Sequence, residues 1–143
     1  MVSTTEKIRV LVIDDHGSLR EGIAAVVNAQ PDMVIAGEAS NGREAIEQYR
    51  GLQPDVTLLD WNLPVLRGEE VITTLIAEFP RARFIVMSAL SGDDSIQRAV
   101  GLGAKAYLCK DMLRWELLPA IRAVHQGHQY LPDKVAASLK NSG

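Results

Sequence analysis

The 143-residue sequence predicts an α/β domain whose central parallel sheet is covered by helices on both faces. Short apolar runs alternate with helix-length segments along the chain, which is the pattern of repeated strand-helix-strand units. These runs are apolar at successive residues rather than at alternate ones, as is typical of strands buried on both faces. Because 47% of the residues are hydrophobic, a chain of this length can bury the core of one such domain.

Five strands are predicted, at residues 8–13, 33–37, 56–59, 84–87 and 106–109. Apolar residues at helical spacing mark three of the intervening helices. Their buried faces are predicted to be Leu19, Ile23, Val26 and Val27; Ile72, Leu75, Ile76 and Phe79; and Leu117, Leu118, Ile121 and Val124. Another helix is predicted at 42–50, because Asn41 is a suitable N-cap, Glu44 follows three residues later and Gly51 comes after its end.

The segment at 93–102 is predicted to be the most weakly anchored helix. Its inner face would be a thin apolar stripe of Ile96, Ala99, Val100 and Gly103. Right-handed crossovers between parallel strands then place five helices on the two faces of the sheet. Beyond these elements, one extra short helix is expected at 131–139. The predicted fold is therefore a flavodoxin-like doubly wound domain with strand order 2-1-3-4-5, five helices and a short C-terminal helix.

Composition and charge exclude several classes of protein. No run approaches the roughly 20 apolar residues of a membrane span, so no membrane partner is expected. A net charge of −3 leaves no basic footprint for nucleic acid in this segment. The polar residues 1–7 lack the pattern of a secretory signal, and the single cysteine, Cys109, lies in an apolar run where a core side chain is expected. A cytoplasmic protein is therefore predicted.

Polar residues gather where the predicted strands end. Asp14 and Asp15 follow the first strand, Asp60 the third, Ser88 the fourth and Lys110 the fifth. In an open parallel sheet, ligands bind outside the carboxyl ends of the strands, where the strand order reverses. Because the first and third strands are neighbours in the order 2-1-3-4-5, their carboxylates would lie close together and repel each other. A hard divalent cation that keeps several waters relieves this repulsion, so the acids predict a Mg²⁺ site.

The remaining strand-end residues predict a bound phosphoryl group. Lys110 supplies a point charge for an anionic oxygen, and Ser88 supplies a hydroxyl donor. With Mg²⁺ holding the phosphoryl oxygens, a carboxylate can act as nucleophile and form an acyl phosphate. Asp60 is the candidate nucleophile because it lies centrally, whereas Asp14 and Asp15 are better placed as metal ligands. The sequence favours the adjacent His16 as a partly exposed residue that begins the first helix, not as a ligand.

The motifs follow one another in a fixed order along residues 7–127. They are Asp14-Asp15, then Asp60-Trp61-Asn62-Leu63-Pro64-Val65-Leu66-Arg67-Gly68, then Ser88-Ala89, then Lys110. In this order they resemble the receiver domain of two-component response regulators. Shorter motifs within this range are similar to those of the NarL/FixJ (LuxR-type) subfamily. They are Asp14-Asp15-His16 with Leu19-Arg20-Glu21-Gly22, and Lys110-Asp111 leading to Glu116-Leu117-Leu118.

The resemblance implies a phosphorylation switch. Asp60 would accept a phosphoryl group from the phosphohistidine of a sensor histidine kinase, and the chain would not be an enzyme that turns over a separate substrate. Asp15, Asp60 and the backbone carbonyl of Asn62 would bind Mg²⁺, and Asp14 would act largely through water. The side chains of Asn62 and Leu90 are expected to tune the lifetime of the acyl phosphate.

The resemblance also implies how the switch is read. Ser88 and Lys110 would contact the phosphoryl oxygens, and Tyr107 matches an aromatic position that turns inward as the hydroxyl of Ser88 moves toward the phosphoryl group. The new charge would thereby reshape the surface around the helix at 93–102. That surface would then bind a partner or a second copy of the chain, giving a homodimer.

Two features depart from the family pattern. Many receivers have a proline in a cis bond after the lysine, whereas this chain has Asp111, where a cis bond would have to be held by its surroundings. NarL/FixJ-type regulators also continue into a helix-turn-helix DNA-binding domain, whereas this sequence stops at Gly143 after the start of a linker, 128–143. We expect either a fragment of a longer transcription regulator, which would reach DNA through that further domain, or a stand-alone receiver.

Two other classes of function are kept open. An atypical receiver would act as a phosphorylation-independent dimerisation or docking module, although the complete set of acids with Lys110 disfavours this reading. A hydrolase of the haloacid dehalogenase type also uses a strand-end aspartate and Mg²⁺. That chemistry needs a second acid two residues after the nucleophile, where this chain has Asn62.

Overall fold

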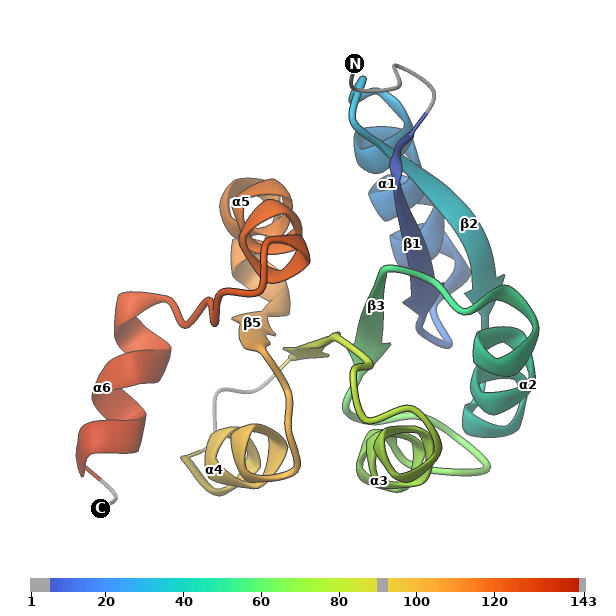
Figure 1. Cartoon of the computed structure of the whole chain (residues 1–143). Coiled ribbons are helices and arrows are strands. Elements are labelled where there is room, and N and C mark those ends of the chain that lie inside the picture. Colours follow the sequence, from blue (N-terminus) through green and yellow to red (C-terminus); the bar gives the residue numbers. More distant parts are fainter. Residues whose placement is uncertain (1–5, 90–92, 142–143) are drawn as a thin grey trace.

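The computed structural model describes residues 6–89 and 93–141, in which strands and helices alternate from β1 to α5 (Figure 1). The strands are β1 (Ile8–Ile13), β2 (Met33–Ala39), β3 (Val56–Asp60), β4 (Phe84–Ser88) and β5 (Ala106–Cys109). The helices are α1 (Gly17–Asn28), α2 (Gly42–Leu52), α3 (Gly68–Glu78), α4 (Asp93–Gly101), α5 (Leu113–His125) and α6 (Asp133–Asn141). A short 3-10 turn, Lys110–Met112, connects β5 to α5.

The strands form one parallel sheet in the order β2-β1-β3-β4-β5, which confirms the predicted topology. Every residue of β3, β4 and β5 is buried, as expected of strands covered on both faces. β1 and β3 are paired in register up to their carboxyl ends, where Ile13 lies opposite Leu59. The residues that follow β1 are therefore brought beside Asp60, the last residue of β3.

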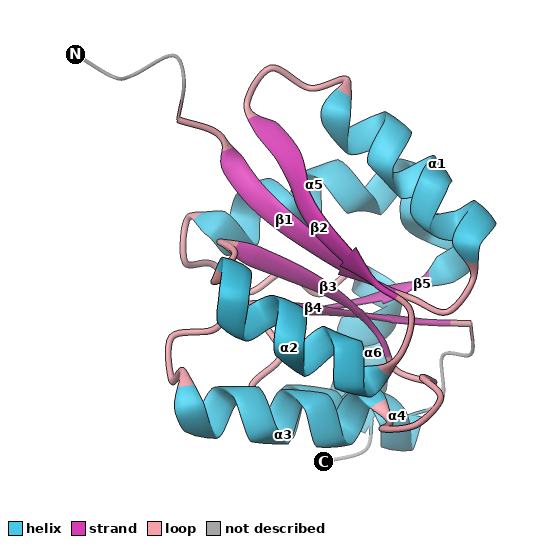
Figure 2. Ribbon diagram, turned by 90° about the vertical axis from the view of Figure 1, so that its right-hand side faces the viewer, coloured by secondary structure: helices cyan, strands magenta, loops and turns pink. Residues whose placement is uncertain are grey.

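Helices cover both faces of the sheet (Figure 2). On one face, α1 and α5 pack against the sheet, where Ile23 of α1 and Ile121 of α5 belong to one apolar cluster with Val12 and Leu58. On the other face, α2, α3 and α4 pack against a second cluster that includes Leu11 of β1. The two faces of each strand thus fill two separate cores, which is the predicted doubly wound arrangement.

Some predicted boundaries and faces differ from the structure. Gly51 lies inside α2, which continues to Leu52 and ends where Gln53 adopts a left-handed φ of 42°. The N-cap prediction is confirmed, because the Glu44 backbone N–H donates to Asn41 Oδ1 at 2.9 Å. The prediction that Val26 belongs to the buried face of α1 is wrong, because this side chain is 44% exposed.

The C-terminal segment returns to the sheet and packs beside α4 (Figure 1). The Tyr130 backbone N–H donates to the Lys105 carbonyl oxygen at 2.8 Å, and the Tyr130 hydroxyl donates to Glu116 of α5. Burial, together with Glu116, raises the pKa of Tyr130 to about 12. Val135 of α6 is buried in the same apolar cluster as Ile96 of α4. The described part of the predicted linker is thus packed onto the domain beside α4.

The start of α2 lies against the loop between β3 and α3. A Cβ atom on Gly42 would come within 2.2 Å of the Leu66 carbonyl oxygen, which belongs to that loop. We expect Gly42→Ala to lower the free energy of unfolding by about 1–3 kcal/mol, because helix and loop would have to move apart. Urea unfolding measures the change.

Gly51→Ala is the matched control in the same helix. Nothing lies within 4 Å of the position of its Cβ atom. This substitution should raise the free energy of unfolding by about 0.5–1 kcal/mol, because alanine restricts the unfolded chain and favours a helix. A Gly42→Ala variant as stable as the native chain would contradict the close approach to Leu66.

Val65, in the same loop, has a φ of 71°, a left-handed conformation that is unfavourable for β-branched residues. Its side chain is 68% exposed, so its replacement removes little packing. Val65→Asn should raise the free energy of unfolding by about 1 kcal/mol, because asparagine tolerates this conformation. Urea unfolding measures this change. Val26→Asn in α1 is the control and should not raise the free energy of unfolding. A loss of stability in Val65→Asn would show that Val65 is not strained.

Candidate functional site

The carboxyl ends of four strands bring the predicted site residues together. Asp14 follows β1, Asp60 ends β3, Ser88 ends β4 and Lys110 follows β5. Asp14 is 0% exposed and Asp60 is 2% exposed, Ser88 is buried, and Lys110 is partly buried. The strand order makes these side chains neighbours, because β1, β3 and β4 lie side by side and end at the same edge.

A buried ion pair joins Asp14 to Lys110. The Lys110 Nζ atom lies 2.7 Å from Asp14 Oδ2 and 3.3 Å from Asp60 Oδ2. Burial alone would raise the pKa of Asp14, but contacts with Lys110 and His16 outweigh it and lower this pKa below its ordinary value. Burial likewise opposes the charge on Lys110, yet Asp14 and Asp60 raise the pKa of its ammonium above the ordinary value. Asp14 and Lys110 are therefore both charged at neutral pH.

Asp60 is less well neutralised than Asp14. Burial raises the pKa of Asp60, and the nearby charge of Asp14 adds to the rise. The Asn62 backbone N–H, which donates to Asp60 Oδ1 at 3.0 Å, and Lys110 offset this only in part. Because Lys110 lies closer to Asp14, the Asp60 carboxylate remains free to interact with another positive group.

Asp15 and His16 extend the cluster toward solvent. The His16 ring is 65% exposed, and its Nδ1 atom lies 2.9 Å from Asp14 Oδ1 and 3.3 Å from Asp15 Oδ1. One ligand atom from each of Asp14, Asp15, His16 and Asp60 lies within 4.8 Å of the others. His16 is the N-cap of α1, as expected, but its ring also faces the acids, which the sequence did not predict.

This set of ligand atoms fits a small divalent cation. The carboxylates of Asp14, Asp15 and Asp60 outnumber the single ammonium of Lys110, so a divalent cation would balance their charge. Carboxylates at a site open to water are also the ligands that Mg²⁺ prefers. The Lys110 ammonium is 2.7 Å from the buried Oδ2 atom of Asp14, which leaves the carboxylates of Asp15 and Asp60 less completely neutralised.

Ser88 and Tyr107 connect the site to α4. Tyr107 is fully buried, and its ring shares an apolar cluster with Ile96 of α4 and Val135 of α6. Burial raises the pKa of the Tyr107 hydroxyl, and hydrogen bonding with Ser88 and Ser95 offsets part of this rise. The ring therefore lies inward in this structure and links the hydroxyl at the site to the packing of α4 and α6.

Arg20 is a site residue to which the sequence analysis assigned no role, although it belongs to the motif Leu19-Arg20-Glu21-Gly22. Its Nη1 atom donates to the Asp14 carbonyl oxygen at 2.5 Å, and its Nε atom donates to Glu38 Oε1 at 3.1 Å. These bonds hold the loop after β1. The signals in the sequence were this motif and the position of Arg20 one helical turn after His16, on the helix that follows the acids.

Four other expectations have mixed outcomes. The Asn62 side chain is exposed, and only its backbone N–H is placed against Asp60. Leu90 lies outside the described residues. No peptide bond among the described residues is cis, so the bond between Lys110 and Asp111 is trans. Cys109 is a buried free cysteine, as predicted.

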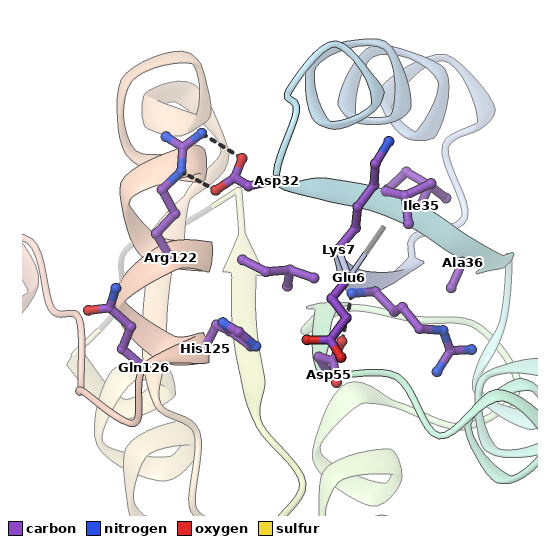
Figure 3. Close-up of a pocket in the computed structure, with 12 residues that line it drawn as sticks. Glu6, Lys7, Asp32, Ile35, Ala36, Asp55, Arg122, His125 and Gln126 are labelled. Carbon is purple, nitrogen blue, oxygen red and sulfur yellow. Dashed lines mark hydrogen bonds and ion pairs between the residues drawn. The ribbon is translucent and has the colours of Figure 1, made fainter. Parts of the chain in front are cut away.

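A groove of about 980 Å³ lies at the opposite ends of the strands (Figure 3). It is lined by residues such as Arg9 at the start of β1, Asp55 before β3, and Arg122 and His125 near the end of α5. Arg122 is already paired with Asp32, with its Nε atom 2.9 Å from Oδ2. The groove contains none of the predicted site residues. No helix formed by the described residues has the length and apolar character needed to cross a membrane.

Comparisons with known proteins agree with this geometry. The model of the response regulator receiver domain matches residues 10–122. The nitrate/nitrite response regulator protein NarL of Escherichia coli (strain K12) is 36% identical over 143 residues, which cover 97% of this chain and 66% of NarL. The transcriptional regulatory protein LiaR of Bacillus subtilis (strain 168) is 38% identical over 140 residues, which cover 95% of this chain and 66% of LiaR. This chain thus spans just under two thirds of the length of these relatives.

A solved structure extends the comparison to three dimensions. The signal receiver domain of a NarL response regulator from Mycobacterium tuberculosis is 33% identical, with a TM-score of 0.81 over 86% of this chain and 99% of that one. The match of the receiver-domain model runs through the strand-end acids and Lys110. The chain therefore belongs to the receiver domain family of two-component response regulators, and its relatives are NarL/LuxR-type transcription regulators.

Proposed function

We propose that this chain is a phosphorylation switch that takes a phosphoryl group onto Asp60. One observation carries the proposal: the buried Asp60 carboxylate lies 3.3 Å from the Lys110 ammonium, which is held more closely by Asp14. Asp60 is therefore a carboxylate that is only partly neutralised, beside a cationic group that can bind phosphoryl oxygens. This combination supports the role of nucleophile for Asp60 and the role of ligand for Asp14.

Mg²⁺ would be held by Asp14, Asp15, Asp60 and the backbone carbonyl of Asn62. When bound, the ion withdraws negative charge from the phosphoryl oxygens and so makes phosphorus a better electrophile. Asp14, already paired with Lys110, would act largely through water, whereas the more exposed Asp15 can turn toward the ion. This division is supported by the different burial of the two acids.

The phosphoryl donor would be a phosphohistidine of a sensor histidine kinase. A carboxylate oxygen of Asp60 forms a bond to phosphorus as the phosphorus-nitrogen bond breaks, and the histidine nitrogen keeps the electron pair. Lys110 would bind one phosphoryl oxygen by its charge, and the Ser88 hydroxyl would donate to another. Water later attacks the acyl phosphate, which releases inorganic phosphate and restores the Asp60 carboxylate. The chain acts on itself in this cycle and is not an enzyme for a separate substrate.

The readout would pass from Ser88 to Tyr107. A hydroxyl drawn toward the phosphoryl group would leave its hydrogen bond with Tyr107, whose ring packs with residues of α4 and α6. A change at the site would therefore alter the surface formed by these helices. A second copy of the chain is the partner that we propose for this surface, so that phosphorylation favours a homodimer.

The receiver domain would comprise residues 7–127, and residues 128–143 would lead toward an output domain. The relatives NarL and LiaR are named as regulators, LiaR as a transcriptional one. We infer that this chain likewise regulates transcription, and that DNA is contacted only through the output domain. The cytoplasm is the compartment in which such a kinase and such an output would meet. A docking module that works without phosphorylation remains the alternative, and the first experiment below separates the two.

Incubation of the native chain with acetyl phosphate and Mg²⁺ should add one phosphoryl group, which intact-mass spectrometry detects. Asp60→Asn should abolish the gain, because an amide is not a nucleophile for this transfer. Lys110→Ala should lower the yield at a fixed time, because the phosphoryl oxygens lose a cationic partner. Omission of Mg²⁺ should also lower the yield of phosphorylated chain.

Asp55→Asn is the matched control for this experiment. Asp55 is an exposed aspartate just before β3 and should leave the gain in mass unchanged. A phosphoryl group on Asp60→Asn would contradict the assignment of the nucleophile. No gain in the native chain, under conditions that phosphorylate another receiver, would favour the docking module.

The raised pKa of Asp60 predicts a change in stability. The unfolded chain, with the ordinary value of 3.8, releases this proton at a lower pH than the folded chain, so ionisation of Asp60 costs stability as the pH rises. Asp60→Asn should therefore be more stable than the native chain at neutral pH without metal. The difference should shrink as the pH falls below the ordinary carboxyl pKa, where Asp60 is protonated in both states.

Urea unfolding in the presence of a chelator, at neutral and at acidic pH, measures the difference in free energy of unfolding between Asp60→Asn and the native chain. Added Mg²⁺ should narrow the difference at neutral pH, because it binds the folded native chain. Asp55→Asn again serves as the control. If the native chain is more stable than Asp60→Asn at neutral pH without metal, ionised Asp60 does not destabilise the folded chain, and the prediction is wrong.

A further inference from the structure

We propose that Arg20 is a positioning residue of the cation site and that it raises the affinity of this site for Mg²⁺ through the backbone of Asp14. The inference rests on the cation site proposed above. It adds to that site a residue that would contact neither the ion nor the phosphoryl group. The hydrogen bonds of the Arg20 side chain, which link the loop after β1 to the end of β2, carry the inference.

The Arg20 guanidinium bridges two neighbouring strands. Its Nη1 atom donates to the Asp14 carbonyl oxygen at 2.5 Å, and its Nε atom donates to Glu38 Oε1 at 3.1 Å. The strands β1 and β2 are paired here, with Ile13 opposite Ala39. The Asp14 backbone N–H donates to the Ala39 carbonyl oxygen at 3.0 Å. Both backbone groups of Asp14 are therefore held, the N–H by β2 and the carbonyl by Arg20.

Asp15 is the acid whose position depends on this link. Its side chain is 38% exposed, whereas the neighbouring Asp14 side chain is 0% exposed and paired with Lys110. Among the described residues, the Asp15 carboxylate forms its one ion pair with the exposed His16 ring, at 3.3 Å. Side-chain packing therefore does little to hold Asp15, although this acid is the one that we expect to bind the ion directly.

The backbone determines where the Asp15 carboxylate points. The peptide group between Asp14 and Asp15 is planar, so a fixed Asp14 carbonyl fixes the orientation of that whole group. The next peptide group is held as well, because the His16 backbone N–H donates to Asp14 Oδ1 at 2.8 Å. With both flanking groups held, the Cα–Cβ bond of Asp15 has one direction. Loss of Arg20 frees the first group, so that binding of the ion must then order the turn.

A through-space effect of the Arg20 charge is the competing explanation, and it predicts a different sign. A positive charge near the acids disfavours a bound cation, so Arg20→Met would raise Mg²⁺ affinity if charge alone mattered. The positioning role predicts that Arg20→Met lowers this affinity. Arg20→Lys keeps the charge, but one ammonium cannot reproduce the planar group whose Nε and Nη1 atoms reach Glu38 and Asp14 together. For this variant, charge alone predicts no change and positioning predicts a loss.

Isothermal titration calorimetry of the full chain with Mg²⁺ measures the effect. Arg20→Met should raise the Kd about tenfold, as expected when a group that orients a metal ligand is removed. Arg20→Lys should raise the Kd about threefold or more. Arg50→Met is the matched control, because Arg50 forms a comparable pair with Glu78 between α2 and α3 and contacts none of the strand-end acids. The control should leave the Kd unchanged.

Two further measurements separate positioning from a general loss of structure. In the metal-free chain, the ¹⁵N order parameter of the Asp15 amide should fall in Arg20→Met, whereas that of Val12 inside β1 should stay the same. With acetyl phosphate, Arg20→Met should need more Mg²⁺ for half-maximal phosphorylation of Asp60. At saturating Mg²⁺ its rate should return to within about twofold of the native rate, because only the binding of the ion is weakened.

The outcomes distinguish this inference from the proposed function. If the native chain does not bind Mg²⁺, the cation site itself is wrong, and the role of Arg20 falls with it. If the native chain binds Mg²⁺ and is phosphorylated, but either Arg20 variant binds Mg²⁺ at least as tightly, the switch stands and the role of Arg20 is overturned. An equal loss of affinity in Arg50→Met would overturn it as well. If Arg20→Met is not folded, the Kd of Arg20→Lys decides.

Discussion

Two buried carboxylates share one ammonium at the edge of the sheet, and this constraint governs the site. Lys110 lies nearer to Asp14 than to Asp60, so the folded chain neutralises one acid well and the other poorly. Desolvation and the like charge of Asp14 both act against ionised Asp60. The fold thus holds an excess of negative charge at this edge of the sheet, which a bound cation can neutralise. A hydrophobic edge would have been more stable, but it would have had no such chemistry.

The surrounding loops keep these charges at fixed positions. Arg20 binds the carbonyl oxygen of Asp14, so the turn that carries both acids of the first strand is anchored to α1. The start of α2 lies so close to Leu66 that only glycine fits at position 42. The loop after Asp60 is therefore held by backbone contact as well as by the Asn62 N–H. A site of opposed charges needs such support, because flexible side chains would otherwise separate them.

Tyr107 lies next to the site and within the apolar core on one face of the sheet. The buried Tyr107 forms a hydrogen bond with Ser88, and its ring belongs to the same apolar cluster as Ile96 of α4 and Val135 of α6. Protein interiors are close-packed, so a ring that moves must be followed by its neighbours or leave a void. The C-terminal helix therefore contributes to the packing around Tyr107. A segment expected to be a linker belongs, in its described part, to the same apolar core as this ring.

The sequence by itself determined the strands, their order and the set of residues at the strand ends. These follow from local patterns, since a strand buried on both faces must be apolar throughout and the handedness of crossovers restricts the topology. Tertiary structure alone decided that Val26 faces solvent, that the His16 ring turns toward the acids, and that Asp14 divides its two oxygens between Lys110 and His16. Side-chain direction and interatomic distance depend on packing between segments far apart in the chain, which periodicity and spacing do not encode.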